Sequence, residues 1–536
     1  MNLVICRSVF YSTVAFVLFS ITSMTRSVAE TASSLPNIVI ILADDLGYGD
    51  VHCYNPMSKI PTPHMDRLAT QGIRFTDGHS SSGVCSPSRY ALLTGRYHWR
   101  TRLQSGIVNP WERPLIDPDR VTIATLAKRL GYRTAAIGKW HLGWNWQITQ
   151  EQRQKWLGTG MKDGVATDEH RRVWKEIFSQ PILNGPTTLG FNYYFGTCVP
   201  NWPPYCFIEN DRTVGIPSEL LPSNMFTRST EGIWLGDAQG PALPGWTFEP
   251  ILPALAEHAE RFIAESAAQP EPFLLYMPLT TPHTPLCPNE EWQGKSGLQH
   301  NVADLIMETD AVVGRIIEAV EKTGQADNTF FFFTSDNGFA SYVGVKNLEI
   351  QGHFPSGPLR SYKGDVYEGG HRIPYIIRWP KVIKPNSVSH QLVHHVDLMA
   401  TLADILNAKL PDNAGEDSFS LLPILKGEDK PIRENAVSCA ARGTPGVRLG
   451  SWKLIIGRES VPNTPQGVKN QLYNLADDLG EQNDLIEKYP DRAVQMFALY
   501  EKLISDGRSN PGPVQKNDED CTPYLQLPGV DLSLRR

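Results

Sequence analysis

The sequence predicts an α/β protein with helices on both faces of a mostly parallel sheet, followed by a smaller α+β domain. Three observations support this prediction. Short, unbroken apolar runs recur along most of the chain, and such runs are typical of strands buried on both faces. Segments with helical periodicity lie between these runs. Strands that alternate with helices favour a parallel sheet with helical crossovers.

The apolar runs are the expected strands. The first, residues 36–42, reads Pro-Asn-Ile-Val-Ile-Ile-Leu and has no polar alternation, so both of its faces should be buried. Four later runs have the same character: residues 133–137, 273–277, 329–333 and 374–379.

Three helices are expected between these strands, over residues 122–130, 252–266 and 304–322. Apolar side chains in the last two repeat at intervals of three and four residues, which places them on one helix face. These side chains are Leu252, Leu255, Ala256 and Ala259 in the second helix, and Leu305, Val312, Ile316 and Val320 in the third.

The last hundred or so residues have a different pattern, with shorter strands close together and one long helix. We expect strands over 436–439, 446–449 and 452–456 and a helix over 491–505. The domain organisation is therefore predicted as a signal peptide (1–29), a large α/β domain (30–430) and a smaller C-terminal domain with a meandering sheet (431–536).

The first 29 residues have the pattern of a secretory signal peptide. Arg7 precedes an apolar run from Val9 to Phe19, and small residues follow at Ser27-Val28-Ala29. The run is too short and too interrupted by Ser12, Thr13 and Ser20 to anchor the chain in a membrane. The mature chain is expected to be periplasmic or secreted, with no membrane association after cleavage.

Composition and cysteine count agree with an exported globular protein. The 536 residues are 41% hydrophobic and 20% charged, and the net charge of −7 gives no reason to expect a nucleic-acid partner. Eight cysteines, less Cys6 in the signal, leave an odd number, so one special thiol is expected. Cys198 and Cys206 flank a proline-rich loop and could form a disulfide, although the pairing cannot be read from sequence.

Cys85 is the candidate special thiol. It opens the run C-S-P-S-R-Y-A-L-L-T-G-R over residues 85–96. Taken alone, a cysteine here would most often be a buried residue at a helix start. Pro87 suits the first turn of that helix, whose amino end would favour a bound anion by about 0.3–1 kcal/mol.

Two pairs of residues with oxygen-bearing side chains follow predicted strands. Asp44-Asp45 follow the first strand, and Asp336-Asn337 follow the phenylalanine-rich strand at 329–333. Each pair alone would most often be a turn. Open α/β sheets, however, place their ligands at the carboxyl ends of strands. An all-oxygen donor set selects calcium or magnesium, whereas zinc would recruit histidine or cysteine.

Three basic segments supply candidate anion ligands. They are Gly138-Lys139-Trp140-His141-Leu142-Gly143, Thr281-Pro282-His283-Thr284-Pro285, and Lys363 within S-Y-K-G-D-V-Y-E-G-G-H-R. Each alone would most often be a surface lysine or a loop histidine. Together with Arg89 and a divalent cation, the lysines outweigh the three aspartates, so the pocket is locally positive and suits an anionic substrate.

These separated segments, taken in their order along the chain, resemble the formylglycine-dependent sulfatases. The resemblance covers nearly the whole mature chain and extends to L-Y-N-L-A-D-D-L-G-E-Q-N-D-L at residues 472–485. It implies an alkaline-phosphatase-like α/β sandwich. It also implies one calcium ion, with magnesium the second choice, held by Asp44, Asp45, Asp336, Asn337 and residue 85.

The resemblance implies that Cys85 is oxidised to formylglycine by a formylglycine-generating enzyme or an anaerobic maturase. The aldehyde hydrate then attacks sulfur, with one hydroxyl polarised by the cation. Arg89 is expected to hold that hydroxyl and the metal-site carboxylates.

The same resemblance assigns the remaining site residues. Lys139, Lys363 and His283 are expected to bind the sulfate oxygens and stabilise the transition state. His283, with Lys363, is expected to protonate the departing alcohol. His141 then takes a proton from the second hydroxyl, so that sulfate is eliminated and the aldehyde returns.

The substrate is expected to be a carbohydrate sulfate ester. Residues 202–211, W-P-P-Y-C-F-I-E-N-D, resemble a segment of bacterial arylsulfatase-A-like enzymes, many of which act on polysaccharides. Two alternatives remain. A phosphatase or phosphodiesterase of the same superfamily would use serine or threonine and a zinc pair with histidine ligands. A silent sulfated-glycan-binding protein would have lost a core residue, and none is missing.

Overall fold

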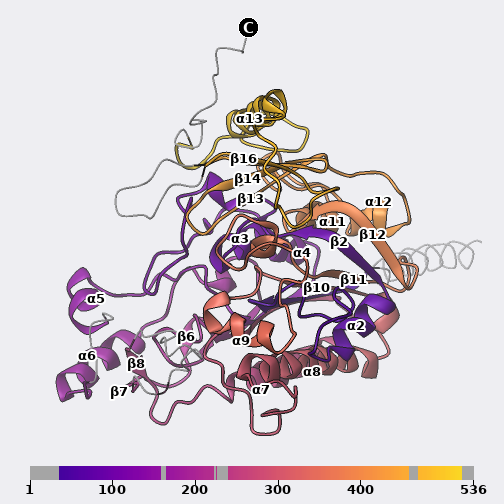
Figure 1. Cartoon of the computed structure of the whole chain (residues 1–536). Helices are drawn as coiled ribbons and strands as arrows, with labels where there is room; N and C mark the ends of the chain where they lie inside the picture. The colour runs from indigo at the N-terminus through magenta and orange to yellow at the C-terminus, as the bar shows by residue number, and fades with distance from the viewer. Residues whose placement is uncertain (1–34, 158–163, 223–224, 226–238, 458–468, 522–536) are drawn as a thin grey trace, which may run out of the picture.

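The computed structural model describes residues 35–157, 164–222, 225, 239–457 and 469–521, so the predicted signal peptide lies outside it. Among these residues, ten strands form a central sheet in the order β12-β2-β11-β10-β1-β9-β3-β4-β5-β6. The strands β2, β10, β11 and β12 of this sheet are labelled in Figure 1. The five strands from β10 to β4 run parallel to one another, whereas β11 is antiparallel to both of its neighbours. The mixed, mostly parallel sheet is as predicted. Its middle strands are β10 (Thr329–Ser335), β1 (Asn37–Asp44), β9 (Phe273–Pro282), β3 (Arg133–Lys139) and β4 (Tyr193–Thr197).

All five predicted strands of the main sheet are present, but several strands were not predicted. The first strand extends to Asp44, and β9 continues five residues past its predicted end. The strand β2 (Ile73–His79) reads Ile-Arg-Phe-Thr-Asp-Gly-His, which has no continuous apolar run, so it was not predicted. The other strands of this sheet are β11 (Tyr375–Arg378), β12 (Ser387–His394), β5 (Ile208–Glu209) and β6 (Arg212–Thr213), while β7 (Glu219–Leu220) and β8 (Pro241–Ala242) pair separately.

Helices cover both faces of the sheet, which explains the unbroken apolar strands. In β1, Ile38, Ile40 and Leu42 belong to one core, and the alternate side chains belong to a second core on the other face. The first core includes side chains of α3 (Cys85–Thr94), α4 (Ile123–Arg129) and α11 (Asp397–Ile405). The second includes side chains of α2 (Pro63–Thr70), α7 (Ile251–Ala267) and α8 (Asn301–Lys322).

The predicted helices differ from the structure only at their ends. Thr122 is the N-cap of α4 rather than part of it, and its hydroxyl accepts a hydrogen bond from the Thr125 amide in a capping box. The helix α8 begins at Asn301, with the His300 side chain as its cap. Shorter helices are α5 (Gln150–Trp156), α6 (Asp168–Phe178), α9 (Val345–Ile350), α10 (Glu368–His371) and α12 (Leu422–Leu425), and 3₁₀ turns lie at His98–Arg100, Pro186–Thr188, Ala326–Asn328 and Ser341–Val343.

The C-terminal part is a four-stranded antiparallel meander with one helix, as predicted, and it lies above the central sheet in Figure 1. A third core joins it to the main domain, because Tyr97 and Trp99 pack with side chains of the meander and of α13. The predicted boundary after residue 430 lies between α12 and the meander and stays a prediction. The elements are β13 (Asn435–Cys439), β14 (Pro445–Leu449), β15 (Trp452–Ile455), β16 (Gln471–Asn474) and α13 (Pro490–Ser505); β16 was not predicted.

A buried charge network also joins the meander to the main domain. Lys453 on β15 lies 2.9 Å from Glu368 on α10 and 2.9 Å from Glu481. Arg448 on β14 lies 3.0 Å from Asp77 on β2. Because α10 follows the segment that carries Lys363, the meander helps to position that segment.

The suggested disulfide between Cys198 and Cys206 is absent. Both residues are buried free thiols. The other described cysteines are also free thiols, and two of them, Cys53 and Cys287, are only partly buried. Within the described ranges, no helix is both long and apolar enough to cross a membrane.

Candidate active site

Four parallel strands end at one edge of the central sheet, and each delivers site residues there. Asp44 ends β1 and Asp45 follows it, Asp336 and Asn337 follow β10, Lys139 ends β3, and His283 follows β9. All these side chains are buried. The sequence pattern that placed polar residues after apolar strands therefore assembles one polar cluster.

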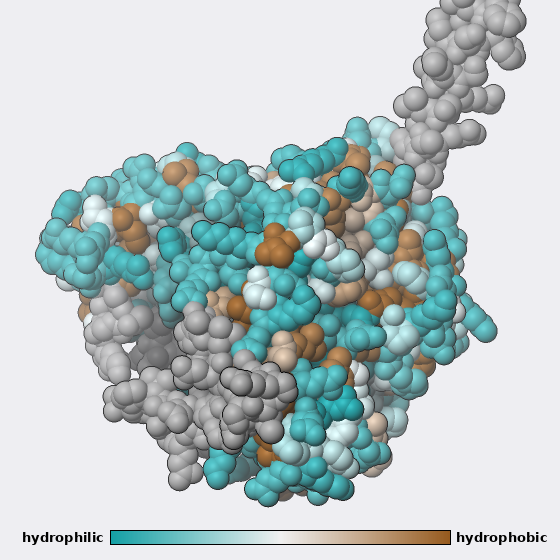
Figure 2. Space-filling model, turned by 90° about the horizontal axis from the view of Figure 1, so that it is seen from above, coloured by the Kyte–Doolittle hydropathy of each residue, from teal (hydrophilic) through white to brown (hydrophobic). Residues whose placement is uncertain are grey.

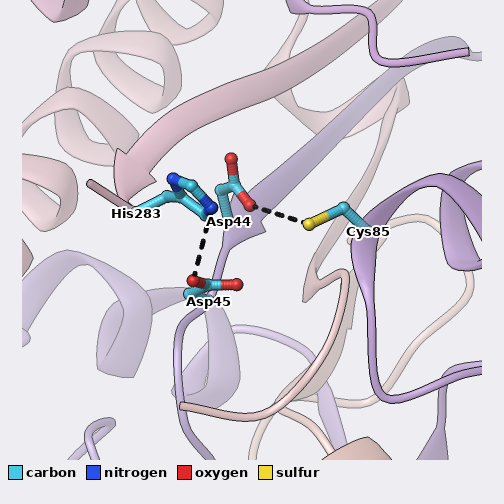
Figure 3. A group of neighbouring side chains, drawn as sticks. All are labelled: Asp44, Asp45, Cys85 and His283. Atoms are coloured by element: carbon cyan, nitrogen blue, oxygen red, sulfur yellow. Dashed lines mark hydrogen bonds and ion pairs between the residues drawn. The ribbon is translucent and has the colours of Figure 1, made fainter. Parts of the chain in front are cut away.

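Cys85 is the first residue of α3 and faces this cluster. Its thiol donates to Asp44 Oδ1 at 3.8 Å (Figure 3). Lys139 Nζ lies 3.7 Å from its sulfur. All ten residues of α3 are buried, and burial raises the pKa of the Cys85 thiol to about 12. Pro87 occupies the third helical position rather than the first, because the helix already begins at Cys85.

Arg89 lies one helical turn after Cys85, so both side chains share a face of α3. Its Nε and Nη2 donate to Asp336 Oδ2 at 3.0 and 2.8 Å, and its Nη1 donates to the Lys139 carbonyl oxygen. Asp336 Oδ1 accepts from the Asp45 amide. Burial and the neighbouring Asp44 raise the pKa of Asp336 to about 6. Arg89 thus fixes the carboxylate that links β10 to β1.

Lys139 and Asp44 form a fully buried ion pair, with Nζ 2.6 Å from Oδ2. Burial opposes ionisation of Asp44, but Lys139, His283 and Arg89 hold its pKa well below the ordinary value. The close approach of β3 to β9 requires glycine at position 138, because a Cβ there would lie 1.8 Å from the Pro278 carbonyl oxygen. This glycine therefore brings Lys139 to its place.

Asp45 lies between Lys363, His283 and Asn337. Its backbone φ of 67° is unusual for a residue other than glycine, and such strain is common at functional sites. Lys363 Nζ lies 2.7 Å from its carboxylate, and His283 Nε2 lies 3.7 Å away (Figure 3). The Asn337 amide nitrogen donates to Asp45 Oδ1 at 2.8 Å.

The donor set fits a hard cation. Asp44, Asp45 and Asp336 offer carboxylate oxygens, and Asn337 Oδ1 is buried with no hydrogen-bond partner among the described residues. An unpaired buried acceptor is costly, so a cation ligated there would satisfy it. Ligand atoms of Asp44, Asp45, Cys85 and His283 also lie within 4.8 Å of one another. The oxygens outnumber the one imidazole and one thiol, which favours calcium or magnesium over zinc.

The two histidines have different surroundings. His141 has a φ of 53°, and neither of its ring nitrogens has a partner among the described residues. Burial, together with Lys139 and Arg89, holds its pKa well below the ordinary value, so the ring is neutral and can accept a proton. His283 Nδ1 is bonded to the Thr284 carbonyl oxygen at 2.8 Å, which leaves Nε2 facing the cluster. Burial, with Lys139 and Lys363, lowers the His283 pKa to about 4.

Two residues that sequence reasoning missed lie at the edge of the site. The Tyr342 hydroxyl lies 3.1 Å from Lys363 Nζ and 3.4 Å from Asp45 Oδ2, and the side chain is 40% exposed. The Trp202 ring packs edge-on against His141, with 5.8 Å between ring centroids. For Tyr342, its position five residues after Asn337 was the one available signal, whereas Trp202 begins the segment 202–211 that had already been compared with arylsulfatase-A-like enzymes.

A second buried group, His79, Glu368 and His371, also has the spacing of metal ligands. Lys453, Arg372 and Arg448 already surround Glu368 with positive charge, at 2.9, 3.2 and 3.7 Å. This group has a single carboxylate with three cationic partners, whereas the active-site cluster has three carboxylates, so we assign this group to the interdomain network.

Comparisons with known proteins agree with the geometry. Residues 36–408 match the model of the Sulfatase family, and residues 362–505 match a family described as N-sulphoglucosamine sulphohydrolase, C-terminal. The chain is 33% identical over 515 residues to N-acetylgalactosamine-6-O-sulfatase of Bacteroides thetaiotaomicron, covering 88% of this chain and 93% of that protein. It is 32% identical over 425 residues to arylsulfatase A of Homo sapiens, covering 78% and 74%.

One solved structure is similar over nearly its whole length. It is described under the metabolism of multiple glycosaminoglycans by Bacteroides thetaiotaomicron, with a TM-score of 0.72 and 30% sequence identity, and the match covers 88% of this chain and 99% of that chain.

Proposed function

The chain belongs to the sulfatase family, and we propose that this sulfuric ester hydrolase removes sulfate from a sulfated carbohydrate. The main support is the position of Cys85 at the start of buried α3, between Lys139 and Asp44. The bacterial relative named for N-acetylgalactosamine-6-O-sulfate makes 6-sulfated N-acetylgalactosamine the first substrate to test.

Cys85 is proposed to be converted to formylglycine by a formylglycine-generating enzyme or an anaerobic maturase. The hydrated aldehyde would supply an oxygen nucleophile and a second hydroxyl through which the sulfate ester can be released. A serine at this position would lack that second hydroxyl. Mass spectrometry of the peptide containing residue 85, after coexpression with a maturase, should show loss of the thiol and gain of an aldehyde or hydrate. Fully active protein with only unmodified cysteine would exclude this conversion.

Calcium is the proposed cation, with magnesium the second choice. Asp44, Asp45, Asp336 and Asn337 would hold it together with residue 85. When bound, it would supply positive charge that polarises oxygen atoms at the reacting centre. Metal analysis should find one calcium per chain, whereas stoichiometric zinc would revive the phosphatase alternative.

Lys139 and Lys363 are proposed to bind the sulfate oxygens from two sides of the site. Lys139 Nζ is fully buried, so its charge acts with little screening from water. Lys363 is only 10% exposed and lies with Tyr342 at the opening. Arg89 is held by Asp336 and by the Lys139 carbonyl oxygen, which fixes it beside residue 85.

The histidines are proposed to move protons in opposite directions. His141 is the base, because its unpaired ring nitrogens can accept a proton. His283 is the donor to the departing alcohol. An entering sulfate group is negative and would oppose the effect of the lysines on the His283 ring, which favours its protonated form.

Sulfate release from 6-sulfated N-acetylgalactosamine, measured by ion chromatography, tests the proposed function. The matured protein should release sulfate, and Cys85→Ala should reduce the rate at least a thousandfold, the usual order for loss of a nucleophile. Cys53→Ala is the matched control, since Cys53 is half-buried outside the site. Release of phosphate from phosphomonoesters, or sugar binding without any sulfate release, would favour one of the two alternatives.

Export is proposed from the amino-terminal pattern alone. Fractionation of cells that express the full chain should place the protein in the periplasm or medium, and amino-terminal sequencing should show that the first 29 or so residues are missing. An uncleaved chain in the cytoplasm would contradict this proposal.

A further inference from the structure

A large cavity lies beside His141. Its volume is about 1130 Å³, and it is lined by the loop around Trp111, the segment from Trp144 to Leu157, and Trp202. The same Trp202 contacts the His141 ring. Since His141 lies two residues beyond Lys139, the cavity adjoins the catalytic cluster.

Tryptophan rings form a firm apolar wall in this cavity. Trp111 packs edge-on against Trp146 at 5.2 Å between centroids, and its Nε1 donates to the Leu157 carbonyl oxygen at 3.1 Å. Phe178 packs behind both rings. Trp111 and Trp146 are largely buried, whereas Trp202 is partly exposed at the rim. Flat rings of this kind stack against the apolar C–H faces of sugars.

Arginines give the cavity a positive charge that the whole chain lacks. Arg102 is partly neutralised, with Nη1 3.9 Å from Glu112. Arg113 and Arg153 also line the cavity and are exposed. Neither forms an ion pair with any residue in the described ranges, so their guanidinium groups are available to a carboxylate or sulfate. The charged residues that line the cavity are thus three arginines and one carboxylate, Glu112, whereas the chain as a whole has a net charge of −7.

We propose that this cavity binds a neighbouring, anionic sugar unit of a glycan chain, next to the sugar whose sulfate is removed. The volume slightly exceeds the usual range for small-ligand pockets, which suits an oligosaccharide. Stacking on Trp202 orients the sugar, and Arg113 and Arg153 bind its carboxylate or sulfate. This inference rests on the proposed function and adds that the enzyme prefers an anionic oligosaccharide to a monosaccharide sulfate.

The test compares two substrates of the matured, full-length protein. One is N-acetylgalactosamine 6-sulfate, and the other is the same sugar linked to a uronic acid. The wild type should have the higher kcat/KM on the disaccharide. In the double variant Arg113→Gln/Arg153→Gln, the ratio of the two kcat/KM values should fall by about tenfold or more, as expected for loss of charge-assisted hydrogen bonds. The control Lys128→Gln/Arg129→Gln also removes two exposed charges, but at the opposite edge of the sheet, and should leave the ratio unchanged.

A binding measurement separates this inference from the proposed function. Calorimetry with Cys85→Ala and the unsulfated uronic acid disaccharide needs no turnover. Binding that weakens about tenfold when Arg113 and Arg153 are also replaced supports the cavity as the subsite. An unchanged substrate ratio together with unchanged binding would overturn the inference, even if sulfate release is observed. Failure to release sulfate from either substrate would instead refute the proposed function.

Discussion

Replacement of Lys453 by methionine should destabilise the protein through the buried interdomain network. Lys453 and Glu368 are 1% and 0% exposed, and Glu481 is also fully buried. The variant keeps both carboxylates but removes the ammonium 2.9 Å from each. Removal of one partner from a buried ion pair typically costs about 3–5 kcal/mol. We therefore expect the free energy of unfolding to fall by about that amount at pH 7.

The loss of stability caused by Lys453→Met should be larger at high pH than at low pH. Burial opposes ionisation of Glu368, but several cationic groups hold its pKa well below the ordinary value, and the effect of Lys453 is the largest of these. A lowered folded-state pKa contributes stability above the unfolded pKa, and that contribution disappears as the pH falls. Without Lys453 the pKa of Glu368 rises and this contribution shrinks. The difference between wild type and variant should thus be larger at pH 8 than at pH 5.

Urea denaturation followed by tryptophan fluorescence measures the effect. Lys502→Met is the matched control, because Lys502 pairs with Asp506 at 2.6 Å but is 70% exposed; we expect it to cost at most about 1 kcal/mol. The double variant Lys453→Met/Glu481→Gln should recover part of the loss, since one unpaired charge is removed. If Lys453→Met is no more harmful than Lys502→Met, the reasoning about the network is wrong.

Three further predictions concern the active site. Chelation of divalent cations should abolish sulfate release and lower Tm, because carboxylates then lose a neutralising charge, and calcium should restore both. His283→Ala should slow substrates with poor alcohol leaving groups more than activated aryl sulfates, whereas His141→Ala should let a sulfate ester accumulate on residue 85, detectable by mass spectrometry. Tyr342→Phe should raise KM severalfold, because its hydroxyl lies 3.1 Å from Lys363 Nζ and helps to hold this proposed sulfate ligand in place.

Each of these predictions has a contradicting result. Full activity and unchanged Tm in chelator would exclude a required cation. Equal effects of the two histidine variants on good and poor leaving groups would refute the division of proton transfer. Unaltered kinetics of Tyr342→Phe, with full stability, would show that this hydroxyl has no part in substrate binding.

The sequence predicted those strands whose own residues are apolar enough to require burial on both faces. The strand at residues 37–44 is apolar on both faces, so its burial between two helical layers followed directly. The strand at 73–79 mixes apolar and polar residues and contains a glycine near its end. Its place in the sheet depends on β11 and β12, which lie far along the chain. The antiparallel strand β11 was predicted as a strand, but its direction depends on the connection that leads to it.

The site was predictable as a set of residues but not as an arrangement. Polar residues after apolar strands indicated where Asp44, Asp45, Asp336 and Asn337 would lie. Nothing local, however, indicates that Trp202 contacts His141 across 61 residues, since this contact exists only in the folded chain. The role of Lys453 was also hidden, because its two carboxylate partners come from different segments.

The burial of α3 restricts when Cys85 could be modified relative to folding of the chain. One side of this helix packs on the central sheet, and Ala91 on the other side packs in the core shared with the C-terminal meander and α13. A modifying enzyme could not reach Cys85, which is 2% exposed, once both layers are in place. The proposed conversion of this cysteine would therefore have to take place while the polypeptide is still unfolded, before its last hundred or so residues have closed over the helix.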